Sequence, residues 1–303
     1  MSKLPDDKLL LLTNIPGSHD STAYNMNIFG SVFAKCQDLN IMDQLKIGVR
    51  LFDIRITKQN DCALSCGINQ IISNLDYDLI CCHGICDCYY INDVGAKKNL
   101  TFKDVLIDMK NFLEENPSET IILGYSSGRG DSYNNIKRAI ELVDKIVGDI
   151  SIKFNRNLTI GEVRGKIINT NYKSDQISSD GKIIFQNGYG GGTGLDEIHQ
   201  KFVPDFTYST FKVTGELKVE EVKVFLETYD ITIEKAEEEW KTNDKKFPFR
   251  YSISCTGEFE SIAPFPKTQA DFANNFFLNY DLKKGNYYGW ISIDFLNIDI
   301  TKN

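Results

Sequence analysis

The chain has 303 residues, of which 42% are hydrophobic and 12% aromatic, and its 34 basic and 42 acidic side chains give a net charge of −8. These proportions exclude disordered, collagen-like and coiled-coil chains and indicate a globular protein with a large core. The acidic balance argues against nucleic acid as a partner, because proteins that bind it neutralise phosphates with clustered Lys and Arg. No apolar run approaches the roughly 20 residues that span a bilayer.

The beginning of the chain and its eight cysteines bear on location. The first apolar run, Leu9 to Leu12, is too short for the apolar segment of a secretory leader and follows two aspartates. We therefore expect reduced thiols and a cytoplasmic protein. A secreted protein whose leader had been removed would give the same pattern, so that alternative stays open.

Apolar runs of strand length alternate with longer segments of helical period, which is the pattern of repeated βα units. The predicted strands are Leu9–Thr13, Val49–Ile56, Leu79–Cys82, Thr120–Tyr125, Lys166–Asn171, Lys182–Phe185, Tyr251–Ser254 and Gly289–Phe295. The predicted helices are Phe102–Leu113, Val219–Trp240 and Gln269–Leu282. No linker rich in Pro, Ser or Gly divides the chain, so we expect a single α/β domain over residues 1–303. The glycine-rich stretch Gly188–Gly194 is interpreted as a loop and not as a nucleotide-binding turn.

Two of the three histidines directly follow predicted strands. His19 lies in I-P-G-S-H-D-S after the first strand, and His83 lies in C-C-H-G after the third. Asp53 and Arg55 share one face of the second strand, because side chains alternate along a strand. The carboxyl ends of the strands of a parallel barrel converge on one rim, where active sites are found. We therefore expect these four side chains to gather at that rim.

The last predicted strand adds a further carboxylate, Asp294. Closing a barrel brings the last strand beside the first, so His19 and Asp294 should be neighbours, as a general base and the carboxylate that orients it. Two imidazoles, a guanidinium and several carboxylates suit phosphoryl transfer without a metal. The alternative is that each is a structural polar group, but their repeated position at strand ends favours function.

These motifs resemble a known family. The segments I-P-G-S-H-D-S, G-V-R-L-F-D-I-R, N-P-S-E-T-I-I and G-W-x-x-x-D, with H-G after the third strand, look like the X domain of phosphatidylinositol-specific phospholipase C. The resemblance runs from about Leu9 to Asn297 and is strongest to the single-domain bacterial type. It implies a distorted, incompletely closed TIM-type (β/α)8 barrel.

The resemblance also implies roles for the matched residues. The histidine at His19 is the general base that takes the proton of the inositol 2-hydroxyl, and the one at His83 is the general acid. The carboxylates and the arginine support them: Asp294 orients the base, Asp20 assists the acid and the arginine, Arg55 clamps the phosphate, and Asp53 is a further pocket carboxylate. The implied products are diacylglycerol and inositol 1,2-cyclic phosphate.

Arg55 separates two branches of the family. Metal-dependent members resemble this site but carry an acidic residue at that strand position, where it binds calcium. A guanidinium can stabilise the same phosphate charge without an ion. The resemblance therefore implies a metal-independent phospholipase C without a cofactor.

The match weakens at residues that would grip the inositol. Ser126 stands where the bacterial pattern has a lysine, the arginine expected near Asn171–Tyr172 is missing, and Ser209 and Phe211 replace an aspartate and a tyrosine. Ser126, Phe211 and Trp290 are the candidate substrate contacts. Phosphatidylinositol, a glycosylated inositol lipid or another phosphodiester with a neighbouring hydroxyl remain open as substrates. A non-catalytic barrel that binds phosphoinositides is the further alternative.

Six of the eight cysteines crowd around His83, at Cys62, Cys66, Cys81, Cys82, Cys86 and Cys88. Their spacing does not form paired C-x-x-C knuckles, so free thiols are favoured over a zinc site. Disulfides would become attractive only in a secreted protein.

A short apolar segment after His19 predicts contact with a membrane surface. Phe29 and Phe33 lie at near-helical spacing, and we expect them to insert at the lipid interface of a peripheral, monomeric protein. The alternative is that both rings pack on the barrel.

Overall fold

A mainly parallel sheet runs through the protein. The computed structural model describes residues 1–26, 34–59, 79–91, 95–130, 132–155, 157–170, 231–242, 251–254, 267, 270–271, 274 and 283–296. The strands follow the order β10 (Tyr251–Ser254), β11 (Trp290–Ile293), β1 (Ile15–Ser18), β2 (Leu51–Lys58), β7 (Ile121–Ser127), β9 (Ile167–Asn169) and β8 (Ser151–Lys153). Every neighbouring pair on this path is parallel. Within the described residues the path is open, as an incompletely closed barrel requires.

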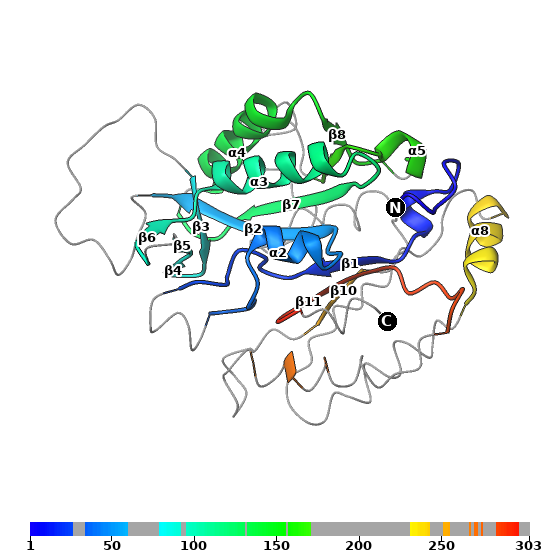
Figure 1. Cartoon of the computed structure of the whole chain (residues 1–303), viewed down its shortest axis with the longest axis horizontal. Coiled ribbons are helices and arrows are strands. Elements are labelled where there is room, and N and C mark those ends of the chain that lie inside the picture. The colour runs from blue at the N-terminus through cyan, green and yellow to red at the C-terminus, as the bar shows by residue number, and fades with distance from the viewer. Residues whose placement is uncertain are drawn as a thin grey trace.

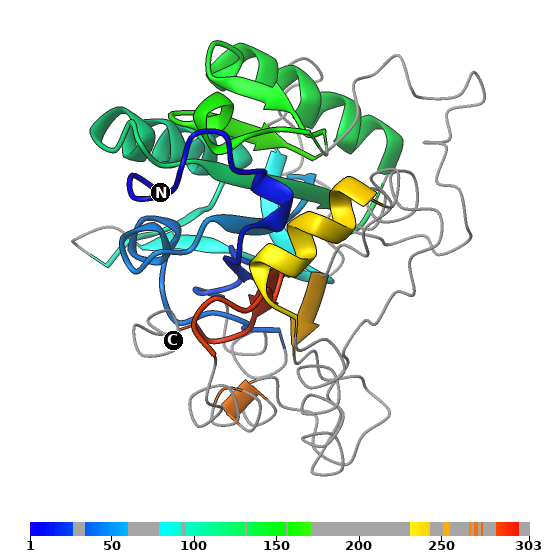
Figure 2. The ribbon, with the colours of Figure 1, turned by 90° about the vertical axis from the view of Figure 1, so that its right-hand side faces the viewer.

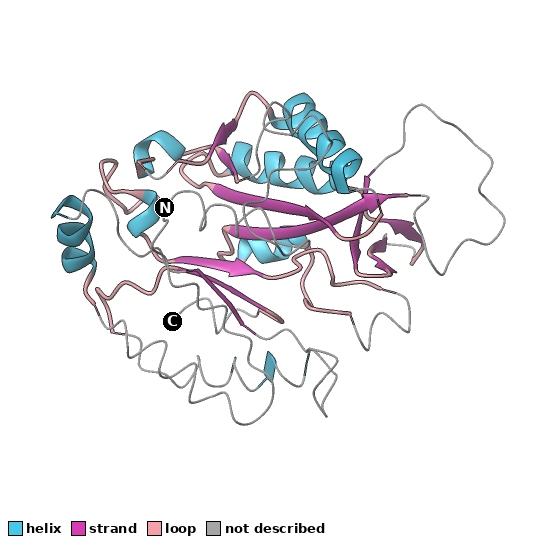
Figure 3. Cartoon of the chain, turned by 180° about the vertical axis from the view of Figure 1, so that it is seen from behind, coloured by secondary structure: helices cyan, strands magenta, loops and turns pink. Residues whose placement is uncertain are grey.

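Helices cover the outside of the sheet. Helices α3 (Phe102–Glu115) and α4 (Ser132–Val147) lie together along β7 in both Figure 1 and the reverse view of Figure 3. Figure 2 shows α8 (Ile233–Thr242) beside the 3-10 turn η1 (Leu10–Leu12). The shorter helices are α2 (Ile41–Lys46) and α5 (Ile160–Val163). None of the described helices is long and apolar enough to cross a bilayer.

Helix α3 forms where its sequence predicts it. Its buried residues recur every third or fourth position, at Phe102, Val105, Leu106, Met109, Phe112 and Leu113, which gives one apolar face. Thr101 and Asp104 close a capping box at its start, in which each side chain accepts a hydrogen bond from the backbone N–H of the other.

The first and last strands of the sheet meet, as predicted. Strand β1 pairs with β11 from Ile15 opposite Trp290 to Ser18 opposite Ile293. A Cβ at Gly17 would lie 2.6 Å from the Ser292 Oγ, so only glycine allows this close approach. The register places the residues after each strand, His19 and Asp294, side by side.

A buried glutamine fastens these two strand ends together. Gln37 Nε2 donates to the carbonyl of His19 at 2.8 Å and to that of Ile293 at 2.9 Å. Its Oε1 accepts from the backbone N–H of Leu296 at 3.3 Å, and the side chain is fully buried. Gln37 therefore satisfies three backbone groups where the two strands end.

The first predicted strand is wrong. Residues 9–13 contain the turn η1, and the strand begins only at Ile15. Leu10, Leu11 and Leu12 are all buried, whereas successive side chains of a strand point to opposite faces. A tight turn buries all three against Phe154 and Trp290 in one cluster.

The third predicted strand forms but runs in the other direction. Strand β3 (Leu79–His83) is antiparallel to β2, with Cys81 opposite Ile56, so the regular βα repeat is interrupted here. A turn at Gly84, whose φ is +55°, leads into β4 (Cys86–Asp87). A separate hairpin joins β5 (Tyr89–Ile91) to β6 (Lys97–Asn99).

The remaining predictions divide into three groups. The strands predicted at 49–56, 120–125, 166–171, 251–254 and 289–295 are confirmed by β2, β7, β9, β10 and β11. Helices α2, α4 and α5 and strands β4, β5, β6 and β8 were not predicted. The predicted strand at 182–185, the glycine-rich loop, and most of the predicted helices at 219–240 and 269–282 lie outside the described residues.

Replacing Gln37 should lower the stability of the fold. Gln37→Met keeps the approximate shape but removes the side-chain partners of the His19 carbonyl and the Leu296 N–H, so we expect a loss of about 2–3 kcal/mol in the free energy of unfolding, measured in urea. The exposed Gln59 gives a matched control, because Gln59→Met should change stability by less than about 0.5 kcal/mol. Equal stability of the two variants would contradict the role given to Gln37.

Candidate active site

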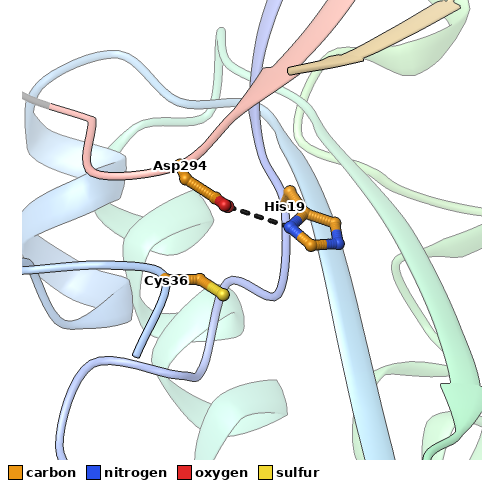
Figure 4. A group of neighbouring side chains, drawn as sticks. All are labelled: His19, Cys36 and Asp294. Carbon is orange, nitrogen blue, oxygen red and sulfur yellow. Dashed lines mark hydrogen bonds and ion pairs between the residues drawn. The ribbon is translucent and has the colours of Figure 1, made fainter. Parts of the chain in front are cut away.

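A buried histidine and aspartate form the centre of the site. His19 follows β1 and Asp294 follows β11, and His19 Nδ1 lies 2.9 Å from Asp294 Oδ1 (Figure 4). Asn274 Nδ2 donates to the carbonyl of Asp294 at 3.0 Å. Both members of the pair have side chains at most 2% exposed. The predicted pairing of the first and last strands is therefore present in atomic detail.

The carboxylate of Asp20 touches all three cationic side chains of the site. Its Oδ1 lies 2.6 Å from Arg55 Nε, and its Oδ2 lies 3.1 Å from His83 Nε2 and 3.4 Å from His19 Nε2. Asp20 has φ of 41°, in the left-handed region that non-glycine residues seldom adopt. Such backbone geometry is concentrated at functional sites.

Strand β2 supplies the guanidinium and a second carboxylate. Arg55 Nη2 lies 3.1 Å from His19 Nε2, and Asp53 Oδ2 lies 4.0 Å from the same nitrogen. Asp53 Oδ2 also accepts from the backbone N–H of Asp20 at 3.4 Å. Ser126 of β7 is the register partner of Arg55, so the two residues lie side by side on adjacent strands.

The second histidine reaches the site from the antiparallel strand. Strand β3 returns along β2, which brings His83 back to Asp20. His83 Nδ1 donates to the carbonyl of Ala34 at 2.7 Å, which fixes the orientation of the ring. Arg129 holds the following turn through the carbonyl of Gly84 at 3.0 Å and an ion pair with Asp87.

The two histidines have opposite electrostatic surroundings. Burial lowers the pKa of His19, but the carboxylates of Asp20 and Asp294 outweigh burial and raise this pKa to about 9. Burial also lowers the pKa of His83, and here the single carboxylate of Asp20 does not compensate, so the pKa lies below 6.5. His83 is therefore the stronger acid of the pair.

The carboxylates also differ from one another. Burial favours protonation of all three, but Arg55 and the histidines hold the pKa of Asp20 below its usual range. Burial dominates at Asp53, where the pKa is raised to about 6, and at Asp294, where it is raised to about 7. Asp20 is thus the carboxylate that keeps its charge most firmly.

The contact between Arg55 and His19 bears on the position of the proton. A guanidinium donates only, so the 3.1 Å contact requires a lone pair on His19 Nε2. In this neutral form of the ring the proton is on Nδ1 and directed at Asp294. Asp20 and Asp294 favour a second proton on the ring and Arg55 opposes it; because the pKa is about 9, the protonated form predominates near pH 7.

The site opens to solvent at one side. The side chains of Arg55 and His83 are 26% and 21% exposed, whereas His19 is 2% exposed and lies behind Arg55. A phosphate that enters would therefore meet the guanidinium and His83 first.

The structure brings together His19, Asp20, Asp53, Arg55, His83 and Asp294, and it places Ser126 next to them. It does not bring Trp290 to them, which corrects that prediction. Trp290 pairs with Ile15 at the opposite end of β1, is fully buried, and packs edge-on against Phe154 at a centroid distance of 5.6 Å. Phe29, Phe33 and Phe211 lie outside the described residues.

Two residues next to the site, adjacent in sequence, were not predicted. Gln37 positions the strand ends, and Cys36 Sγ lies 3.6 Å from His83 Nδ1 and 4.0 Å from Asp20 Oδ2. Nothing in the segment A-K-C-Q-D distinguishes these side chains from ordinary loop residues. Their proximity to the predicted histidine motif is the one available signal.

Four of the crowded cysteines, Cys81, Cys82, Cys86 and Cys88, lie in the described residues and are buried, and Cys81, Cys82 and Cys88 are free thiols. Burial raises the pKa of Cys82 to about 12 and those of Cys81 and Cys88 well above their usual value. Cys62 and Cys66 lie outside the described residues. Within the described part of the chain, the groups able to hold a metal are His19–Cys36–Asp294, Asp20–Cys36–His83 and His19–Asp20–Asp53.

Comparison with known proteins bears on the family. The model of the phosphatidylinositol-specific phospholipase C X domain matches residues 13–170, which is more than half of the chain. The 1-phosphatidylinositol phosphodiesterase of Staphylococcus aureus (strain Newman) is 28% identical over 244 residues, covering 77% of this chain and 66% of that relative. The chain therefore spans slightly less than two thirds of the relative's length.

Solved structures agree with this assignment. Phosphatidylinositol-specific phospholipase C from Listeria monocytogenes aligns over 100% of this chain and 96% of its own, with a TM-score of 0.58 and 22% identity. A structure of the S. aureus enzyme, from work on modulation of its membrane binding, gives the same coverage, a TM-score of 0.59 and 22% identity. These likenesses show the fold, a TIM-type barrel. Together with the match over residues 13–170, they place the chain in the phosphatidylinositol-specific phospholipase C X-domain family.

Proposed function

We propose that this chain is a metal-independent phosphatidylinositol phosphodiesterase that forms diacylglycerol and inositol 1,2-cyclic phosphate. The observation that carries the proposal is the shared carboxylate of Asp20, which contacts Arg55, His83 and His19 at 2.6, 3.1 and 3.4 Å. A base, an acid and a phosphate-binding cation thus lie within reach of one phosphodiester. Membership of the family supports the same chemistry.

His19 begins the reaction. Its Nε2 takes the proton of the inositol 2-hydroxyl while the Nδ1–H remains bound to Asp294. The hydroxyl oxygen forms a new bond to phosphorus, and the bond from phosphorus to the glycerol oxygen breaks. Asp294 stabilises the imidazolium that results, because the added charge lies next to the carboxylate.

His83 completes the step by giving a proton to the departing glycerol oxygen. Its pKa lies below 6.5, so the imidazolium gives up its proton readily. Asp20 counterbalances this tendency and keeps the imidazolium accessible, since its carboxylate faces His83 Nε2 at 3.1 Å. After the step His83 is neutral and His19 carries the proton.

Arg55 has two successive partners in this scheme. In the structure its Nη2 contacts His19 Nε2 at 3.1 Å, and this is the nitrogen that must accept the proton. A phosphate that binds Arg55 draws the guanidinium away and exposes the base. The guanidinium then stabilises the charge that develops on the phosphate oxygens.

Arg55 also supports catalysis without calcium. Calcium takes six to eight oxygen ligands, whereas the site supplies three close carboxylates, one of which is already paired with the guanidinium at 2.6 Å. A second cation in the phosphate-binding position would meet the charge of Arg55. The positive charge that calcium supplies in the metal-dependent members is therefore supplied here by the Arg55 side chain.

The substrate is proposed at the level of class. Phosphatidylinositol and its glycosylated forms both present a phosphodiester next to an inositol hydroxyl, and Ser126, the register partner of Arg55, is the proposed contact to the ring. Insertion of Phe29 and Phe33 into the membrane surface stays a prediction, and so do the monomeric state and the cytoplasmic location.

The reaction and its metal requirement can be tested together. Phosphorus NMR of phosphatidylinositol vesicles with the protein and excess EDTA should show the signal of inositol 1,2-cyclic phosphate. His19→Ala, folded by circular dichroism, should be slower by about 10²–10⁴-fold, because the base is lost. Loss of turnover in EDTA that calcium restores would contradict metal independence, and absence of any product would favour a phosphate-binding barrel.

The pH profile should report both histidines. His19 must be deprotonated, which is favoured above about pH 9, and His83 must be protonated, which is favoured below its own lowered pKa. The fraction of enzyme with His19 neutral and His83 protonated is constant between the two pKa values, because one of these forms rises with pH as the other falls. A plot of log kcat/KM against pH should therefore show a broad plateau that declines above about pH 9.

The alkaline limb can be assigned with one substitution. Asp294→Asn removes a carboxylate that raises the pKa of His19, so the alkaline limb should move to lower pH. Rates are measured from pH 5 to 10 on the same vesicles. An alkaline limb that does not move in Asp294→Asn would show that His19 does not set it.

A further inference from the structure

A buried thiol lies between the two histidines of the site. Cys36 is 1% exposed, and its Sγ lies 3.6 Å from His83 Nδ1 and 4.0 Å from Asp20 Oδ2. Figure 4 shows the sulfur beside the His19–Asp294 pair. The reaction described above assigns this thiol no role.

The side chains around the sulfur are the donors that zinc prefers. Thiolate sulfur, imidazole nitrogen and carboxylate oxygen are its usual ligands, and in a tetrahedral site neighbouring donors lie roughly 3.3–3.6 Å apart. The ligand atoms of Asp20, Cys36 and His83 lie within 4.8 Å of one another, and the sulfur is 3.6 Å from His83 Nδ1. The Asp20 carboxylate faces Nε2, so it would move toward Nδ1 to complete three ligands, and Nδ1 would exchange its proton and the Ala34 carbonyl for the ion.

The charges of the site also favour a cation. Asp20, Asp53 and Asp294 face one guanidinium, and a thiolate would add a further negative charge. Asp53 Oδ1 and Asp294 Oδ2 are buried oxygens without a hydrogen-bond partner. Asp294 belongs to a second group of three ligands that shares the Cys36 sulfur. Arg55 occupies Oδ1 of Asp20, whereas the ion would use Oδ2.

Metal binding fits this thiol better than oxidation does. Burial, together with Asp294 and Asp20, raises the pKa of Cys36 well above its usual value, so the free thiol stays protonated and reacts slowly with oxidants. A zinc ion can displace the proton from sulfur as it binds. The 21% exposed His83 gives the ion a route from solvent.

We propose that Cys36, His83 and Asp20 form an inhibitory site for zinc or another thiophilic divalent cation. The ion would replace the proton on His83 Nδ1 and hold the Asp20 carboxylate. The ring could then no longer become an imidazolium, and its remaining Nε2–H would be too weak an acid to protonate the departing oxygen. The loss of activity rests on the proposed function, whereas binding of the ion does not. This inhibitory ion is separate from catalysis, which needs none.

The test compares two buried thiols. Zinc is titrated against turnover of phosphatidylinositol vesicles by chelator-treated wild type, Cys36→Ser and Cys88→Ser, each referred to its own rate without zinc. Cys88 is fully buried but belongs to no three-ligand group in the described residues, so Cys88→Ser should remain as sensitive as wild type. Cys36→Ser should need at least about ten-fold more zinc, because a ligand is lost.

A binding measurement separates this site from the proposed reaction. Cobalt(II) should give the near-ultraviolet absorption of a thiolate–cobalt bond with wild type and Cys88→Ser but not with Cys36→Ser, whether or not the lipid is turned over. Equal zinc sensitivity of wild type and Cys36→Ser would overturn the proposal. So would a wild-type cobalt complex without the thiolate band.

Discussion

The site depends on one buried carboxylate that faces three cationic groups. Asp20 contacts Arg55, His83 and His19 and, because the guanidinium and imidazoles surround it, keeps a pKa below its usual range. An unpaired carboxylate at this depth would be strongly disfavoured, so the three partners are held where it is. The same charge raises the pKa of His19 and limits the fall in the pKa of His83. One side chain thus contacts all three cationic groups and favours the protonated form of both histidines.

The fold places this carboxylate by joining strands from opposite ends of the chain. Gly17 lets β1 approach β11 closely, and Gln37 donates to the carbonyls of His19, directly after β1, and of Ile293, the last residue of β11. The backbone then turns through positive φ at Asp20 and at Phe295, the residue after Asp294. Positive φ is unfavourable for both residue types, and the hydrogen bonds of this region hold the turns in place. The two strained turns therefore lower the stability of the fold in order to position the site.

The gathering of the site residues could be predicted from sequence because they lie at strand ends. His19 and Asp294 meet since the first and last strands of a barrel are neighbours. The direction of β3 could not be predicted, because a short apolar run has the same pattern in parallel and antiparallel pairs. The proximity of Cys36 to His83 could not be predicted, because it depends on the tertiary contacts of a loop without periodicity. Trp290 was assigned to the site from its motif, although its strand position faces the core.

In the proposed reaction the two histidines act at opposite ends of the phosphodiester, and a change of leaving group tests this most directly. The nitrophenolate of a nitrophenyl inositol phosphate leaves without a proton, whereas the glycerol oxygen of the lipid must be protonated as it leaves. His83→Ala should therefore lose about 10²–10⁴-fold on the lipid but little on the nitrophenyl ester, while His19→Ala loses activity on both. Equal losses of His83→Ala on the two substrates would contradict its role as the general acid.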